Sequence, residues 1–304
     1  MRLDHFLREK LFWRSRASVQ RLIGGGAVLL AGGRRARPAT RVREGEILTV
    51  LLPARPPLPL PVYPSTELPV LYRDRVLLAV DKPAGLPVHP SGRHQEGTLV
   101  GLLHRHFWEE GQPPGRVPRL CHRLDRETSG VILATTDESV RHLVGRQFEE
   151  RSIVKTYLAL VEGCPDPPAG IIDLPLAPDP RSRVRMAMEA RRDGRGRPAL
   201  TRYRVTGRGE RFSLVQVVPA TGRQHQIRVH LAAIGHPLVG DKIYGPDAGW
   251  FLDSLRGQLS AEAKARLVLE RHALHAWKLE FSHPLGKERM EVVAPLPEDM
   301  ADLL

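Results

Sequence analysis

The chain has 304 residues, and 41% of them are hydrophobic, which is enough for one large domain with a buried core and a smaller domain beside it. It carries 46 Lys and Arg against 34 Asp and Glu, a net charge of +12, so we expect a polyanionic partner whose phosphates release counterions when neutralised. Only seven of the basic residues are Lys, and a genome rich in Arg codons is an equal explanation of the Arg excess.

The sequence has no pattern typical of an exported or membrane protein. Cys121 and Cys164 are too few for a disulfide framework or a zinc site, which fits a reducing cytoplasm. The first residues alternate charged and apolar types, and the uncharged stretch 22–33 is broken by five glycines. We therefore expect a cytoplasmic protein without a membrane segment.

Residues 1–52 have the pattern of a small, separate αβ unit. Apolar residues recur at helical spacing over 3–11 and again over 19–23, where a run of glycines ends the second helix. Short strands are predicted at 27–30 and 46–51. The alternative is a helical appendage that only packs on the rest of the chain.

Six prolines from Pro53 to Pro64 predict a stiff, extended linker over 53–66, because proline joins neither a helix nor a central strand. Over 67–304, short β-type runs alternate with helical intervals, which indicates a mixed α+β domain. The segment Arg181 to Arg197 is basic and broken by glycines, so it is predicted to be a loop. Strands are expected at 76–80, 131–134, 153–161, 202–206 and 212–218, and helices at 98–106, 138–150 and 225–234.

Short motifs follow one another along this second domain. Lys82-Pro83-Ala84-Gly85 and His89-Pro90 come first, and the segment His122 to Gly130 then places Asp125 in a basic, turn-forming frame. The later motifs are Lys155-Thr156-Tyr157, Gly222-Arg223-Gln224-His225-Gln226-Ile227-Arg228 and Gly240-Asp241-Lys242-Ile243-Tyr244. In this order they resemble the RluA-type RNA pseudouridine synthases. The resemblance implies an α+β fold with a bent, mainly antiparallel sheet and a central cleft, and an enzyme that isomerises uridine in RNA.

The N-terminal unit resembles the S-four-type RNA-binding module that precedes the catalytic domain of many such enzymes. The matching residues are Arg2-Leu3-Asp4, Ser15-Arg16 and the Glu-Gly-Glu-Ile of 44–47. Ala31-Gly32 stands where Asn-Gly is usual, and Glu46 stands where Asp is usual. The resemblance implies RNA contacts by Arg2, Ser15 and Arg16.

The resemblance also implies roles for residues of the catalytic domain. Asp125 matches the catalytic aspartate, which acts as a base or nucleophile while an N-glycosidic bond is exchanged for a C-glycosidic one. Arg228 matches an arginine that pairs with it, and a cation is needed there because removal from water raises a carboxyl pKa. Tyr157 matches a tyrosine that stacks on the target uracil. Arg123 and Arg223 are expected to contact RNA, Arg123 where the target nucleotide leaves the helix stack.

Other readings of these residues are open from the sequence. Taken alone, Asp125 would suit a surface turn or a helix cap, Arg228 a helix surface and Tyr157 a strand core. Glu127 would share a strand face with Asp125 in a two-carboxylate hydrolase, which would release free uracil or sugar. A second alternative is a non-catalytic RNA-binding assembly factor.

We expect neither a cofactor nor a metal. The sequence lacks the glycine spacing of a phosphate loop or a dinucleotide site, and no Cys or acidic ligand lies among His225, His230 and His236. The expected partner is RNA, with large-subunit ribosomal RNA preferred and transfer RNA as the alternative. The protein is expected to act as a monomer.

Overall fold

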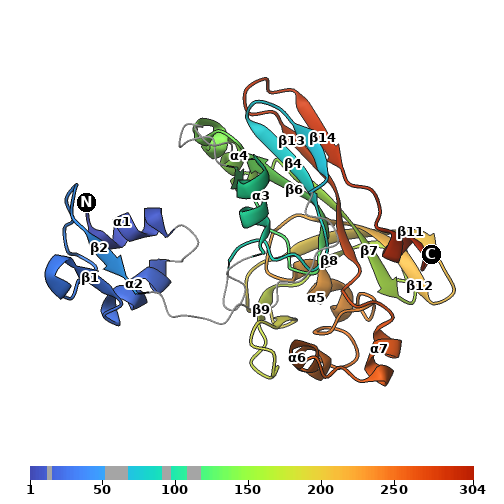
Figure 1. Ribbon diagram of the computed structural model, residues 1–304. Coiled ribbons are helices and arrows are strands. Elements are labelled where there is room, and N and C mark those ends of the chain that lie inside the picture. The colour runs from blue at the N-terminus through green and yellow to red at the C-terminus, as the bar shows by residue number, and fades with distance from the viewer. Residues whose placement is uncertain (12–15, 52–67, 91–96, 108–117) are drawn as a thin grey trace. The chain divides into compact units, whose positions relative to one another are not determined.

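The computed structural model describes residues 1–11, 16–51, 68–90, 97–107 and 118–304 (Figure 1). The chain divides into two compact units, one of residues 1–64 and 89–101 and the other of residues 65–88 and 102–304. The predicted linker, 53–66, lies outside the described residues, so its extended form stays a prediction.

The first unit contains the predicted helices and strands, in the predicted order. Its two strands pair antiparallel, with Val28 opposite Val50, and its helices bury Leu3, Leu7 and Val19 against them. Gly32 has a φ of 77°, a left-handed conformation that glycine adopts without strain, and it makes the turn after the first strand. The elements are α1 (Leu3–Lys10), α2 (Arg16–Gly24), β1 (Val28–Leu30), the 3-10 helix η1 (Ala31–Gly33) and β2 (Leu48–Val50).

The second unit is built on a ten-stranded sheet. All neighbouring strands in it are antiparallel except one pair, β6 and β13, so the predicted mainly antiparallel sheet is confirmed. Its order is β3 (Val70–Arg73), β4 (Leu77–Lys82), β6 (Ser129–Thr135), β13 (Leu274–Ser282), β7 (Val154–Glu162), β12 (Phe212–Pro219), β11 (Leu200–Arg208) and β8 (Ala169–Asp173), while β5 (Arg119–Leu120) pairs with β6 and β14 (Arg289–Val293) pairs with β13.

Two helices cover different parts of this sheet. Val140 and Val144 of α4 (Glu138–Glu149) pack with residues of β4, β6 and β13 in one core. Ile227 and Leu231 of α5 (Gln226–Ala233) pack with residues of β7, β11 and β12 in another. The remaining helices are α3 (Leu99–Phe107), α6 (Gly249–Arg256), α7 (Ala261–Leu267) and α8 (Glu298–Ala301).

The parallel contact between β6 and β13 requires a glycine. Gly130 lies opposite Ala276 and has a φ of 108°. A Cβ at this position would lie 2.3 Å from the carbonyl oxygen of Ala276, far inside van der Waals contact. Because Gly130 directly follows the segment that carries Asp125, this close approach fixes the end of that segment.

The five strands and the helices predicted for the second unit are confirmed. The prediction of a loop from Arg181 to Arg197 is wrong in part, because Met188–Ala190 forms β10 and pairs with β9 (Leu176–Pro178). Met188 and Ala190 pack beside Val229 of α5, so a tertiary contact orders this segment.

None of the helices in the described part of the chain is long and apolar enough to cross a bilayer.

Candidate active site

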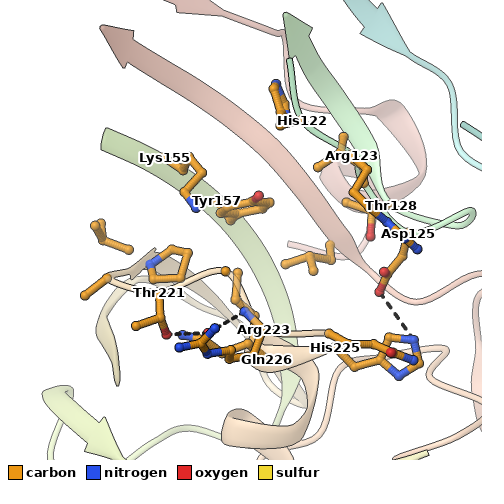
Figure 2. A pocket seen from close by; sticks show the side chains of 18 of the residues that line it. His122, Arg123, Asp125, Thr128, Lys155, Tyr157, Thr221, Arg223, His225 and Gln226 are labelled. Atoms are coloured by element: carbon orange, nitrogen blue, oxygen red, sulfur yellow. Dashed lines mark hydrogen bonds and ion pairs between the residues drawn. The ribbon is translucent and has the colours of Figure 1, made fainter. Parts of the chain in front are cut away.

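A cleft of about 800 Å³ opens in the second unit. Its walls come from the loop before β6, from β7, from the end of β12 and from the loop that leads into α5 (Figure 2). The predicted cleft is therefore present. Every site residue predicted for this unit lines it: Arg123, Asp125, Tyr157, Arg223 and Arg228.

Asp125 lies in a loop whose backbone is held from below. The amide of Thr128 donates to the carbonyl of Asp125 at 3.2 Å, which closes a turn. The next carbonyl, that of Arg126, accepts from the fully buried Lys82 ammonium at 3.0 Å. Lys82 also donates to the carbonyls of Pro83 and Leu86, so the predicted turn at 82–85 packs beneath the loop. Burial lowers the pKa of Lys82 to about 7, and three carbonyl acceptors match the three hydrogens of its charged form.

Opposing effects act on the charge of Asp125. Burial by itself raises the pKa of this carboxyl, whereas His225 and Arg228 lower it, and the result is a pKa below the usual range. Burial lowers the pKa of His225 to about 4, so its ring is uncharged at neutral pH. The permanent charge of Arg228, whose Nη1 lies 3.2 Å from Oδ2 of Asp125, is therefore what keeps the carboxylate ionised.

Arg228 is buried rather than on a helix surface, and a second carboxylate holds it. Its Nε and Nη2 donate to the two oxygens of Asp241, both at 2.8 Å. An oxygen of Asp241 also accepts from the amides of Ile243 and Tyr244, at 2.9 and 3.0 Å. The fork of Arg228 thus has a fixed orientation, and Nη1 remains for Asp125.

The loop before α5 is fastened by Gln226. Its side-chain oxygen accepts from the hydroxyl of Thr221 at 2.6 Å and from the amide of Arg223 at 3.0 Å (Figure 2). Its side-chain nitrogen donates to the carbonyl of Leu200 and to the hydroxyl of Thr201 on β11. Gln226 therefore connects this wall of the cleft to the sheet.

Three further predicted residues lie around the cleft. Tyr157 is half-buried on β7, and burial raises the pKa of its phenol, which stays protonated. Arg123 is exposed, and the half-buried Arg223 donates from Nε to the carbonyl of Pro198 at 3.1 Å. Lys155 lies beside Tyr157 on the same wall (Figure 2).

The predicted RNA contacts of the first unit differ in what surrounds them. Nε and Nη2 of Arg2 donate to the carboxylate of Asp4 at 3.0 and 3.1 Å, and about half of the Arg2 side chain is exposed. Arg16 is exposed at the start of α2. Ser15 lies outside the described residues. Their contacts with RNA stay predictions.

Glu127 does not share a strand face with Asp125, because residues 122–128 form a loop and turn rather than a strand. One of its oxygens accepts from Lys242 at 2.9 Å and the other from the amide of His272 at 3.2 Å. Burial raises its pKa, but His272 and Lys242 outweigh burial and lower the pKa to about 2. A carboxyl that stays ionised at neutral pH is unsuited to donate a proton in hydrolysis.

Three residues of this site stood in quoted motifs but were given no role there: His225, Asp241 and Tyr244. An Asp that caps the amides after it is a typical turn former, and this was the available signal for Asp241. His225 lies at a φ of 54°, which no pattern in the sequence indicates.

The three histidines considered for metal bind separate partners: His225 contacts Tyr244, His230 contacts Thr201 and the carbonyl of Leu174, and His236 contacts the carbonyl of Glu162.

Comparison with known proteins identifies the family of each part of the chain. Residues 76–233 match the RNA pseudouridylate synthase family, and residues 1–48 match the S4 domain. An uncharacterized RNA pseudouridine synthase of Chloroflexus aurantiacus is 40% identical over 100% of this chain and 89% of that protein. The ribosomal large subunit pseudouridine synthase D of Zymomonas mobilis is 34% identical over 98% of this chain and 91% of that protein.

A solved structure supports the same family. Human RNA Pseudouridylate Synthase Domain Containing 4 is 30% identical, with a TM-score of 0.59 over 77% of this chain and 90% of that chain. The chain belongs to the RNA pseudouridine synthase family, and the predicted RluA-type membership is confirmed. It is an RNA-modifying enzyme with an N-terminal S4 domain.

Proposed function

We propose that this enzyme converts uridines of large-subunit ribosomal RNA to pseudouridine, with the carboxylate of Asp125 as the reacting group. One observation carries the proposal: the Asp125 carboxylate stands in the wall of a large cleft, 3.2 Å from the guanidinium of the buried Arg228. A carboxylate that is kept ionised beside space for a nucleotide is suited to act as a nucleophile or base.

The reaction is an isomerisation and consumes no other reactant. The bond from C1′ of the ribose to N1 of uracil breaks, and the bond from C1′ to C5 forms. The hydrogen on C5 leaves to water and N1 gains a proton, so atoms and electrons balance. Asp125 either adds to the sugar or the base, or removes the C2′ proton, and both routes need the ionised form that Arg228 maintains.

Two other residues have proposed roles toward the RNA. The ring of Tyr157 stacks on the target uracil, and such stacking contributes about 1–3 kcal/mol for a base that has left its helix. The exposed Arg123 occupies the place that the target nucleotide leaves, and Arg223 contacts phosphate from the opposite wall.

The choice of RNA is supported by two features. Relatives over nearly the whole chain are named ribosomal large subunit pseudouridine synthase D. Residues 1–51 contain 11 basic and 4 acidic residues, hence +7, which suits a module that contacts phosphates. We propose 1–52 as this RNA-binding module, 53–66 as the linker and 67–304 as the catalytic domain, in a monomer that acts in the cytoplasm.

The test uses RNA carrying [5-³H]uridine, in which loss of the C5 hydrogen reports pseudouridine formation. We expect tritium release from large-subunit ribosomal RNA, little release from transfer RNA, and no free uracil. Release from transfer RNA alone would contradict the proposed substrate, and free uracil would indicate a hydrolase. Mapping pseudouridines by carbodiimide primer-extension stops, in cells with and without the gene, then identifies the modified positions.

A further inference from the structure

The imidazole of His225 lies against Asp125, yet the proposed chemistry leaves it without a role. Its Nε2 is 3.9 Å from Oδ2 of Asp125, the oxygen that Arg228 also contacts (Figure 2). This distance exceeds that of a hydrogen bond, but catalytic contacts are often long until the substrate fills the site. His225 reaches this position from a left-handed backbone conformation, with a φ of 54°, which few residues other than glycine adopt.

The hydrogen bonds of Tyr244 determine which ring nitrogen of His225 carries the hydrogen. The Tyr244 oxygen accepts from the amide of Met188 at 3.0 Å and lies 2.6 Å from Nδ1 of His225. Burial raises the pKa of Tyr244, so its hydroxyl keeps its hydrogen. In the part of the chain that the structure describes, Nδ1 is the acceptor within reach of that hydroxyl. The neutral ring therefore carries its hydrogen on Nε2, which faces Asp125.

Tyr244 contacts the other donor of Asp125 as well. The guanidinium carbon of Arg228 lies 5.0 Å from the centre of the Tyr244 ring, within cation–π range. The ring of His225 meets the same tyrosine edge-on, with centres 5.6 Å apart. One side chain thus touches both groups that point at Oδ2.

We propose that His225 is a positioning residue whose Nε2–H, directed by Tyr244, donates to Oδ2 of Asp125 when RNA fills the cleft. With Arg228 and His225 both on Oδ2, the other oxygen is left to react. Among the described residues, no side chain donates a hydrogen bond to Oδ1. This inference rests on the proposed role of Asp125.

Loss of the His225 donor removes a group that stabilises the carboxylate, so the pKa of Asp125 rises. The remaining neighbours set how far it rises. Arg228 and His272 favour the ionised form, and Lys82, whose pKa is about 7, adds a positive charge below that pH. Asp241 partly offsets Arg228, and Tyr157 and Tyr244 are neutral phenols. The rate of the variant should therefore begin to fall at a higher pH than that of the wild type.

The test measures single-turnover pseudouridine formation from about pH 3 to about pH 9, a range that includes the acid limb of the wild type. Tyr244→Phe keeps the ring under Arg228 and removes only the hydroxyl. We expect the rate to fall roughly tenfold, as for one lost hydrogen bond. The acid limb of the pH–rate profile should also move to higher pH. A uniform loss at every pH, with the limb unmoved, would indicate a structural hydroxyl and overturn the inference.

A double-mutant cycle tests independently whether the Tyr244 hydroxyl acts through His225. In His225→Gln, the amide donates toward Asp125 without needing a tautomer, so most of the rate should remain. Adding Tyr244→Phe to His225→Gln should then have almost no further effect. The same tenfold loss in both backgrounds would show that the hydroxyl does not act through His225. His225→Leu, which has no donor, should repeat the pH shift of Tyr244→Phe.

The outcomes separate this inference from the proposed function. If the wild type forms no pseudouridine, both fail. If the wild type is active and the Asp125→Asn variant is inactive, but the acid limb is the same in all His225 and Tyr244 variants, only the positioning role fails. Urea unfolding of each variant checks that the fold is retained.

Discussion

At the scale of residues, the guanidinium of Arg228 serves two carboxylates at once. Nε and Nη2 donate to Asp241 and Nη1 is left for Asp125, so one cation both holds the site together and keeps the proposed reacting group ionised. Only a planar fork with several donors is able to do this; an ammonium has its donors at one point.

Arg228→Lys should therefore lower the single-turnover rate roughly 10- to 100-fold while RNA affinity changes little. The charge remains but the fork geometry is lost, so the acid limb of the pH–rate profile should also move to higher pH. Arg256→Lys, at an exposed arginine at the end of α6, is the matched control and should behave as wild type. A rate for Arg228→Lys within about twofold of the control, with the same pH profile, would contradict the pairing.

Tyr157 allows stacking to be separated from phenol chemistry. Among the described residues its hydroxyl has no hydrogen-bond partner, so Tyr157→Phe orphans no group. We expect this variant to retain its rate within about threefold, and Tyr157→Leu to lose roughly 5- to 150-fold with the stacking energy. Single-turnover rates at saturating RNA decide the matter, and an inactive Phe variant would assign the hydroxyl a proton-transfer role.

At the scale of elements, the apolar runs were enough to predict the central strands. Leu77 to Val80 of β4 are all buried, so the run is continuous and unambiguous. β13 was not predicted, although Trp277, Leu279 and Phe281 alternate with polar residues as in a half-buried strand. Asp125 and Arg228 were predictable from their motifs. The contact of His225 with Tyr244 was not, because it depends on a left-handed residue and on the turn at Asp241.

Gly130 shows how an element places the site. Gly130→Ala should lower the free energy of unfolding by more than about 2 kcal/mol, because a Cβ meets the Ala276 carbonyl and the φ is positive. Gly145→Ala, in the middle of α4 with open space around it, should instead raise it by roughly 0.5–1 kcal/mol. Urea unfolding midpoints measure both, and equal midpoints would refute the close approach.

At the scale of the whole molecule, the positive charge is unevenly distributed. Residues 1–51 contribute +7 of the net +12 with about a sixth of the sequence. Affinity from such a region is salt-dependent and independent of the base that is modified. The small unit is therefore expected to contribute to RNA binding and the cleft to chemistry.

Replacing the exposed Arg16 and Arg21 together by Gln tests this division in the full chain. The slope of log K against log salt should become shallower by roughly 1 to 2, with weaker binding at low salt. The single-turnover rate at saturating RNA should not change. An unaltered slope would show that these side chains do not contact phosphate.

The most direct measurement concerns Asp125 itself. Asp125→Asn keeps the size and most polar contacts of the side chain but removes its negative charge, so tritium release from [5-³H]uridine RNA should fall on the order of 10³-fold or more. Filter binding of the same RNA should stay close to that of wild type, and Asp302→Asn, the same change at an exposed position, should release tritium normally. Substantial tritium release by the Asp125→Asn variant would contradict the claim that this carboxylate is the reacting group.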